Sequence, residues 1–187
     1  MTLLALMVDR RAALFRRWLD AVLADYGAQT AVRWRREDPF GNPVGHTLST
    51  GLPQLLEAIA GAGEIPAGTA TALEAILRIR SVQELSPSRA VGFVYRLRDV
   101  IRDELASELA GGGRSAELAE VDGRIERLAW LAFDVYVRLR EQIFRLRQEE
   151  LKRSVASLLR RWHGDAPSEP DPGVVRLSPP QGPDSPR

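Results

Sequence analysis

Residues from about 115 to 162 carry the longest helical pattern of the chain, and this pattern limits the fold more than any other feature. Apolar residues in its first part are spaced by four and three positions, which is a heptad: Val121, Ile125, Leu128, Ala132, Val135 and Leu139. The spacing slips afterwards, where Gln142 and Glu149 take heptad positions while Ile143 and Leu146 are apolar. At ~1.5 Å per residue this helix would be about 70 Å long. We therefore predict an all-α protein with a long C-terminal helix.

Four shorter amphipathic segments precede this helix and predict four further helices, at about residues 2–26, 48–60, 71–85 and 86–109. Ser86 and Pro87 suit the N-cap and the first turn of the last of these, and Thr71 and Glu74 have the spacing of a capping box. Pro53 fits its helix only in the first turn, because an interior proline loses a hydrogen bond. Together with the long helix, these segments predict one compact bundle of about five helices over residues 1–163.

The two ends of the chain differ from this bundle. Residues 164–187 contain seven prolines and no helical period, so we predict a disordered tail, with a proline-rich ligand motif as the alternative. The apolar run at residues 3–7 precedes its arginines, which is the wrong order for a signal peptide, and it is too short to span a bilayer. We expect a cytoplasmic protein without a membrane span.

Composition excludes several kinds of chemistry. The chain has no cysteine, which rules out disulfides and thiol catalysis, and its two histidines, His46 and His163, are too few for a histidine-based metal site. Neither histidine is placed in a helix where it would ligate haem. No phosphate-binding glycine loop, GxSxG or HExxH motif is present. We therefore expect no cofactor, no metal and no enzymatic activity.

The segment DPFGNPVGHTL, residues 38–48, is punctuated by two prolines and two glycines. Proline favours extended backbone at the residues before Pro39 and Pro43, and the glycines permit a tight reversal. We expect Phe40 to pack onto the helices, and Asn42 and Pro43 to shape the turn. His46 is interpreted as a loop residue that caps the next helix. The alternative is that this loop is a pocket lid or a partner surface.

Asp134 stands out because WLAFDVYV, residues 130–137, is apolar on every side of a helix. A buried carboxylate needs a partner, and Arg138 lies four residues away; Arg80, Arg98 and Arg102 on neighbouring helices are further candidates. We predict a buried structural ion pair. A proton- or ligand-responsive carboxylate remains the alternative.

Residues 138–161 contain eight basic and three acidic side chains, a local excess of five positive charges in a chain of net charge +1. Such clusters can bind phosphates. No recognised nucleic-acid-binding module is present, and Glu141 pairs naturally with Arg145. We predict a solvated helix face, with weak nucleic-acid binding as the alternative.

Three stretches resemble a known family: DPFGNPVGHTL, LRIRSVQELSPSRAVGFVYRLRDVIRDEL and IERLAWLAFDVYVRLREQIFRLRQEELKR. They are similar to the RsbRD-type N-terminal domain of stressosome RsbT co-antagonist proteins. The resemblance covers about residues 10–155 and implies a globin-like fold without haem that serves as a sensory or regulatory input. In such relatives the signal passes down the final helix to a STAS or kinase module, which residues 164–187 do not resemble.

The resemblance also supplies candidate residues: besides Ser86, Pro87 and Ser88 at the corner between two of the predicted helices, they are Phe40, Asn42, Pro43, Gln83, Asp134, Tyr136, Arg140 and Glu141. With His46 and Arg138, the latter residues form our set of candidate regulatory or pocket residues. We expect a non-enzymatic input module in bacterial signalling that binds a ligand or a protein partner. It would form a homodimer through its first and last helices. The rival hypothesis is a helical adaptor subunit of a larger complex, with a redox-associated complex as one option.

Overall fold

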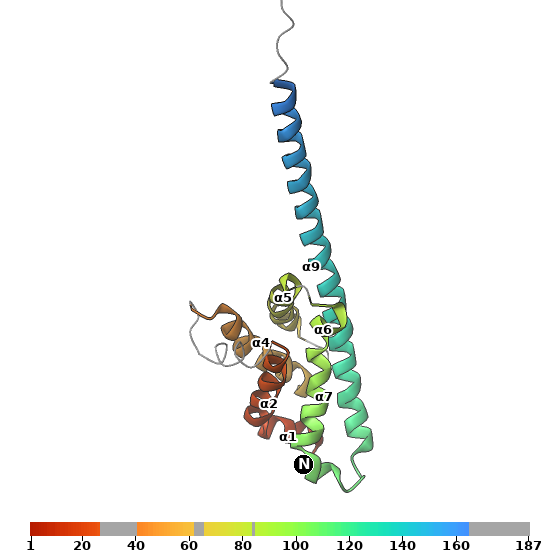
Figure 1. The fold of residues 1–187 in the computed structure, drawn as a ribbon. Coiled ribbons are helices and arrows are strands. Elements are labelled where there is room, and N and C mark those ends of the chain that lie inside the picture. The colour runs from red at the N-terminus through yellow and green to blue at the C-terminus, as the bar shows by residue number, and fades with distance from the viewer. Residues whose placement is uncertain (27–40, 62–65, 84, 165–187) are drawn as a thin grey trace, which may run out of the picture. The chain divides into compact units, whose positions relative to one another are not determined.

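The computed structural model describes residues 1–26, 41–61, 66–83 and 85–164, which form eight helices and no strand (Figure 1). This confirms the predicted all-α class with a long C-terminal helix. The helices are α1 (Leu3–Asp9), α2 (Arg11–Ala24), α4 (Pro43–Ala60), α5 (Ala67–Val82), α6 (Pro87–Val91), α7 (Phe93–Glu104), α8 (Ala106–Leu109) and α9 (Ser115–Gly164). The chain divides into two units, residues 1–145 and 146–187, which are described separately.

The predicted first helix is divided at Arg10 into α1 and α2. Thr2 caps α1 by accepting a hydrogen bond from the amide of Ala5. The change of direction at Arg10 allows both helices to bury an apolar stripe, which includes Leu3 and Met7 of α1 and Leu14 and Trp18 of α2. The predicted fourth helix is likewise divided, at Gly92 and Leu105, into α6, α7 and α8.

Two helices begin earlier than predicted. The side chain of Asn42 accepts a hydrogen bond from Gly45 N (2.9 Å), and Pro43 occupies the first turn, so α4 begins at Pro43. Part of the predicted loop is therefore helix, and Pro53 lies inside α4 rather than in its first turn. Helix α5 begins at Ala67, so the predicted capping box at Thr71 is wrong.

Ser86 and Pro87 are placed as predicted, since the Ser86 hydroxyl accepts from the amide of Arg89 and Pro87 opens α6. Gly92 then joins α6 to α7. A Cβ atom at this position would lie 2.7 Å from the carbonyl oxygen of Ser88, so the junction requires glycine.

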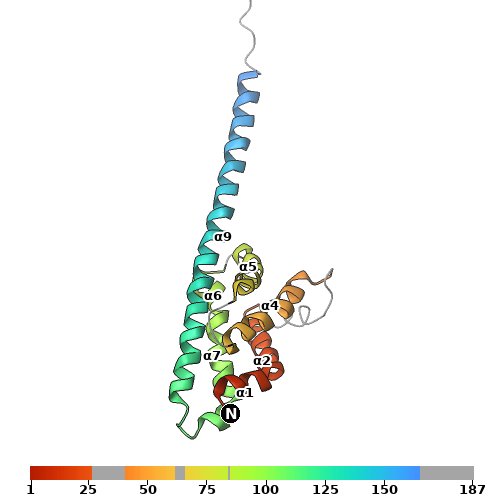
Figure 2. The same ribbon diagram turned by 180° about the vertical axis from the view of Figure 1, so that it is seen from behind.

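Within residues 1–145, α4 packs on α5, and α2 packs on both α7 and α4 (Figures 1 and 2). Gly51 lets α4 approach α5, because a Cβ atom there would lie 2.9 Å from Cδ1 of Ile76. The six heptad residues of α9 from Val121 to Leu139 are all buried in the same core, as the sequence predicted.

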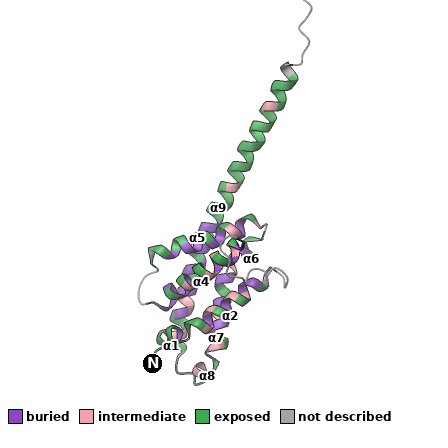
Figure 3. Cartoon of the chain, turned by 90° about the vertical axis from the view of Figure 1, so that its left-hand side faces the viewer, coloured by how far each residue is buried: buried purple, intermediate pink, exposed green. Residues whose placement is uncertain are grey.

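In the second unit, residues 146–164 continue α9. Its side chains from Leu146 to Trp162 are exposed apart from the half-buried Ser157 (Figure 3). Among the described residues no helix is long and apolar enough to cross a membrane.

Candidate functional site

An open groove of about 800 Å³ lies between α6, α7 and α9, inside the first unit. Its lining is mostly apolar and consists of Pro87, Ser88, Val91, Gly92, Tyr95, Ala129, Trp130, Phe133 and Asp134. A volume of this size is within the range of ligand pockets, about 300–1,000 Å³. The groove is therefore a mostly apolar surface, and Asp134 is the one charged residue among its described lining residues.

Three aromatic side chains of the groove are exposed to solvent. Trp130 is 66% exposed, Phe133 50% and Tyr95 41%. Aromatic side chains bury a large apolar area when they are covered, and Trp and Tyr are enriched in protein interfaces for that reason. Such a cluster next to a concave surface is typical of contact sites.

Asp134 is exposed, so the predicted buried ion pair is wrong. Its predicted partner Arg138 donates instead to Glu74 of α5 (2.9 Å), and among the described residues no cation forms an ion pair with Asp134. Helix α9 buries Ala132, Val135 and Tyr136 and leaves Trp130, Phe133 and Asp134 outside the core. The carboxylate is thus at the edge of the groove and not in the core.

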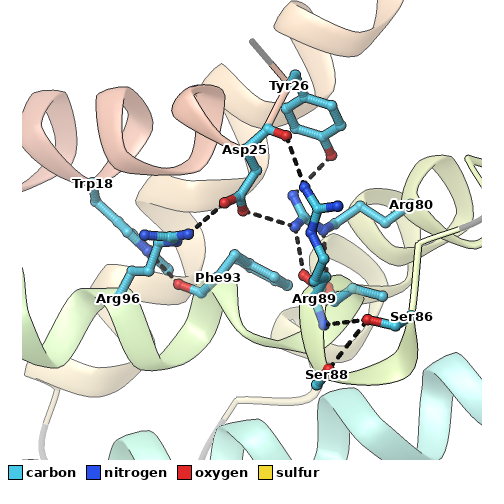
Figure 4. A network of polar contacts seen from close by, with 10 residues as sticks. Trp18, Asp25, Tyr26, Arg80, Ser86, Ser88, Arg89, Phe93 and Arg96 are labelled. Atoms are coloured by element: carbon cyan, nitrogen blue, oxygen red, sulfur yellow. Dashed lines mark hydrogen bonds and ion pairs between the residues drawn. The ribbon is translucent and has the colours of Figure 1, made fainter.

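A buried polar network lies beneath the α6–α7 junction (Figure 4). The guanidinium of Arg80, on α5, is fully buried and donates to the carbonyl oxygens of Arg89 (2.8 Å) and Ala90 (2.9 Å), to the hydroxyl of Tyr26 (2.8 Å) and to the carboxylate of Asp25 (3.1 Å). It also lies over the rings of Tyr26 and Phe93. One side chain therefore joins the end of α2 to α5, α6 and α7.

The carboxylate of Asp25 forms a second ion pair, with Arg96 of α7. The main-chain oxygen of Asp25 accepts a hydrogen bond from the Arg89 side chain. Nearby, the indole of Trp18 donates to the carbonyl oxygen of Phe93 (2.8 Å) and stacks on its ring (Figure 4). A hollow of about 260 Å³ over Asp25 and Arg96 adjoins the groove, because Ser88, Gly92 and Tyr95 line both. The network consequently supports one wall of the groove.

Burial raises the pKa of the Tyr26 hydroxyl above its ordinary value of 10.0, and the neighbouring Arg80 charge opposes part of this rise. The folded protein thus retains a proton that the unfolded chain loses above pH 10. We expect stability to be complete below pH 10 and to fall as pH rises through the folded-state pKa. Urea denaturation at several pH values above 10 measures this change. The free energy of unfolding should fall less steeply with pH in Tyr26→Phe than in the wild type, and an equal fall in both would contradict the role given to Tyr26.

Three candidate residues meet at the corner between α5 and α6. The hydroxyl of Tyr136 donates to the carbonyl oxygen of Leu85 (3.0 Å), and Arg140 donates to that of Ser81 (3.2 Å). Gln83, the C-cap of α5, is half-buried, and its Oε1 has no hydrogen-bond partner among the residues that the structure describes. These contacts fasten α9 to the end of α5.

The other candidates are dispersed. Asn42 is the buried N-cap of α4, and Pro43 and His46 are exposed in its first turn. His46 is therefore a helix residue, and the expectation of a loop histidine is wrong. Glu141 is exposed and pairs with Arg145 (3.7 Å), as predicted. Phe40 lies outside the described residues.

Sequence reasoning missed the groove and the Arg80 network, although both leave a signal. Arg80 falls on the buried stripe of α5, seven residues after Leu73 and three after Leu77. Trp130 and Phe133 fall outside the buried heptad of α9. An apolar residue off the buried stripe therefore predicts an exposed apolar surface.

No group of three potential metal-ligating side chains occurs among the residues that the structure describes. The family described as the RsbT co-antagonist protein RsbRD N-terminal domain matches residues 12–151. No curated protein and no solved structure matches the chain.

Proposed function

Because this chain belongs to the RsbRD N-terminal domain family, a family of stressosome-related signalling input domains, we propose that it is a non-enzymatic input module that acts by binding a protein. The family is not known for enzymatic activity. The single observation that carries the proposal is the exposed aromatic groove of α6, α7 and α9.

The groove suits a protein surface better than a reaction. Its polar side-chain groups are the hydroxyls of Ser88 and Tyr95, the indole N–H of Trp130 and the carboxylate of Asp134, and the described lining residues include no histidine and no second carboxylate. General acid–base chemistry needs a positioned partner group. Covering apolar surface is worth about 25 cal/mol per Å², so three exposed rings favour association.

We propose a second copy of the chain as the first partner. Trp130, Phe133, Val137 and Phe144 are exposed on α9 within the first unit, at spacings of three, four and seven residues. These spacings place them on one helix face. In a two-fold symmetric pair the same face of both copies would be covered.

Such an interface would couple the binding of a partner at the groove to the position of helix α9. Helix α9 forms a wall of the groove and is also fastened to the α5–α6 corner through Tyr136 and Arg140. Small shifts of a helix at an interface are a common switching device. A partner that seats against Trp130 and Phe133 would bias the position of the same helix.

The test is sedimentation equilibrium of the full chain over a wide concentration range. The double variant Trp130→Ser/Phe133→Ser should weaken self-association by about tenfold or more, since each ring contributes more than 1 kcal/mol when it is covered. Val82→Ser is the matched control, because Val82 is 63% exposed on α5 and does not line the groove.

The wild-type chain and the control should form the same dimer. A wild type that stays monomeric at every concentration would refute the second copy as partner. A dimer that the double variant leaves unchanged would place the interface elsewhere.

A further inference from the structure

The second unit carries an apolar stripe that is separate from the groove. Leu151, Val155, Leu158 and Trp162 follow one another at steps of four, three and four, which places them on one face of the helix. All four are exposed, Trp162 most of all at 80%. No part of the residue 146–164 helix covers this face.

Basic side chains border the stripe on both sides. Lys152 lies along one edge, and Arg147 and Arg161 lie along the other, by their helical positions. Arg153, Arg160 and Glu149 occupy the opposite face, and Glu150 lies on the same side of the helix as Arg161. Five basic and two acidic residues give this helix a charge of +3, although the whole chain carries only +1.

Leu151 follows Phe144 of the proposed dimer face by seven residues, so a second copy could also cover the stripe, but the charges beside the stripe disfavour that occupant. When Leu151, Val155, Leu158 and Trp162 are taken as the a and d positions of a two-stranded coiled coil, Arg147, Lys152 and Arg161 occupy e and g positions. No carboxylate occupies an e or g position in residues 146–162. Opposite charges at these positions normally stabilise such pairs. Two copies would bring like charges together in either orientation.

Nucleic acid also fits poorly. A phosphate backbone would contact the basic residues but would leave the four apolar side chains in water. In addition, Arg138, Arg140 and Arg145 of the first unit are engaged by Glu74, the Ser81 carbonyl oxygen and Glu141. The remaining basic residues lie on the same helix segment as the apolar stripe.

We propose that residues 146–162 bind in the plane of an anionic lipid surface. Interfacial helices place apolar and Trp side chains at the boundary of the acyl chains and keep lysine and arginine at the headgroups. Four or more basic residues on such a helix are typical of binding to anionic lipid.

The test is co-sedimentation of the full chain with vesicles of phosphatidylcholine alone and of an equimolar mixture with phosphatidylglycerol. Leu158→Ser removes a stripe residue. Leu146→Ser is its matched control, because Leu146 is equally exposed (63% against 61%) on the same helix but lies off the stripe. A third variant, Lys152→Glu/Arg161→Glu, reverses the charges beside the stripe.

The wild type and Leu146→Ser should bind the anionic vesicles, and binding should weaken in high salt. Leu158→Ser should weaken binding by about tenfold or more, and the charge-reversed variant should lose the preference for anionic lipid. Failure of the wild type to bind, or equal binding by both leucine variants, would overturn the proposal. The proposal would also be overturned if no vesicle binding were seen and Leu158→Ser instead lost self-association or duplex DNA binding. A second copy or nucleic acid would then be the occupant of the stripe.

Discussion

Replacing Asp25 with alanine is expected to lower the free energy of unfolding by about 3–5 kcal/mol, the cost of leaving a buried charge without its partner. The partner is Arg80, whose side chain is fully buried and whose Nη2 lies 3.1 Å from the Asp25 carboxylate. Three other hydrogen bonds and two ring contacts hold the guanidinium in place, so it cannot escape to solvent easily. Urea denaturation followed by far-ultraviolet circular dichroism measures the change.

Glu74→Ala is the matched control. Glu74 also contacts two arginines, Arg78 (2.7 Å) and Arg138 (2.9 Å), but these three side chains are exposed or half-exposed. Solvent-exposed pairs contribute about 0–1 kcal/mol each. Equal effects of the two substitutions would mean that Asp25 and Arg80 are solvated and that the network does not support the α6–α7 junction.

Trp18→Ala is expected to cost about 3–5 kcal/mol, which is typical of removing a buried aromatic side chain. Trp18 is fully buried on α2, stacks on Phe93 at 6.2 Å between ring centroids and donates to its carbonyl oxygen. The substitution leaves a cavity at the contact between α2 and α7. Thermal unfolding of the two alanine variants Trp18→Ala and Trp130→Ala provides the comparison.

Trp130→Ala should change stability by no more than about 0.5 kcal/mol, because Trp130 is an exposed residue of the groove. Replacing each tryptophan with alanine thus separates two roles. Trp18 is expected to contribute to stability, and Trp130 to association. A large destabilisation of the monomer by Trp130→Ala would show that this ring belongs to the core, and the groove would then lose its main exposed group.

The sequence predicted those parts of the fold that a repeating pattern encodes. The six heptad residues of α9 are buried, and the Ser86–Pro87 start of α6 is observed, because spacing and capping chemistry act locally. The start of α4 was misplaced because Asn42 and Pro43 were assigned to a turn, whereas an asparagine followed by proline also serves as an N-cap and first helical residue.

The candidate site was predicted less well, since its properties depend on contacts between distant segments. The apolar run WLAFDVYV does not tell which of its residues face the protein interior, so Asp134 was expected to be buried and is exposed. Tyr136 and Arg140 were expected to matter, and both bind the α5–α6 corner. Arg80 was considered only as a partner of Asp134, because nothing local connects it with Asp25, 55 residues earlier in the sequence.

The two hydrogen bonds that fasten α9 to the α5–α6 corner both end on main-chain oxygens, those of Ser81 and Leu85. Every amino acid offers such an oxygen, so these two hydrogen bonds place no requirement on the side chains at positions 81 and 85. Covariation between aligned relatives would therefore miss this attachment. Amide exchange rates near the corner, compared between wild type and Tyr136→Phe, would detect it.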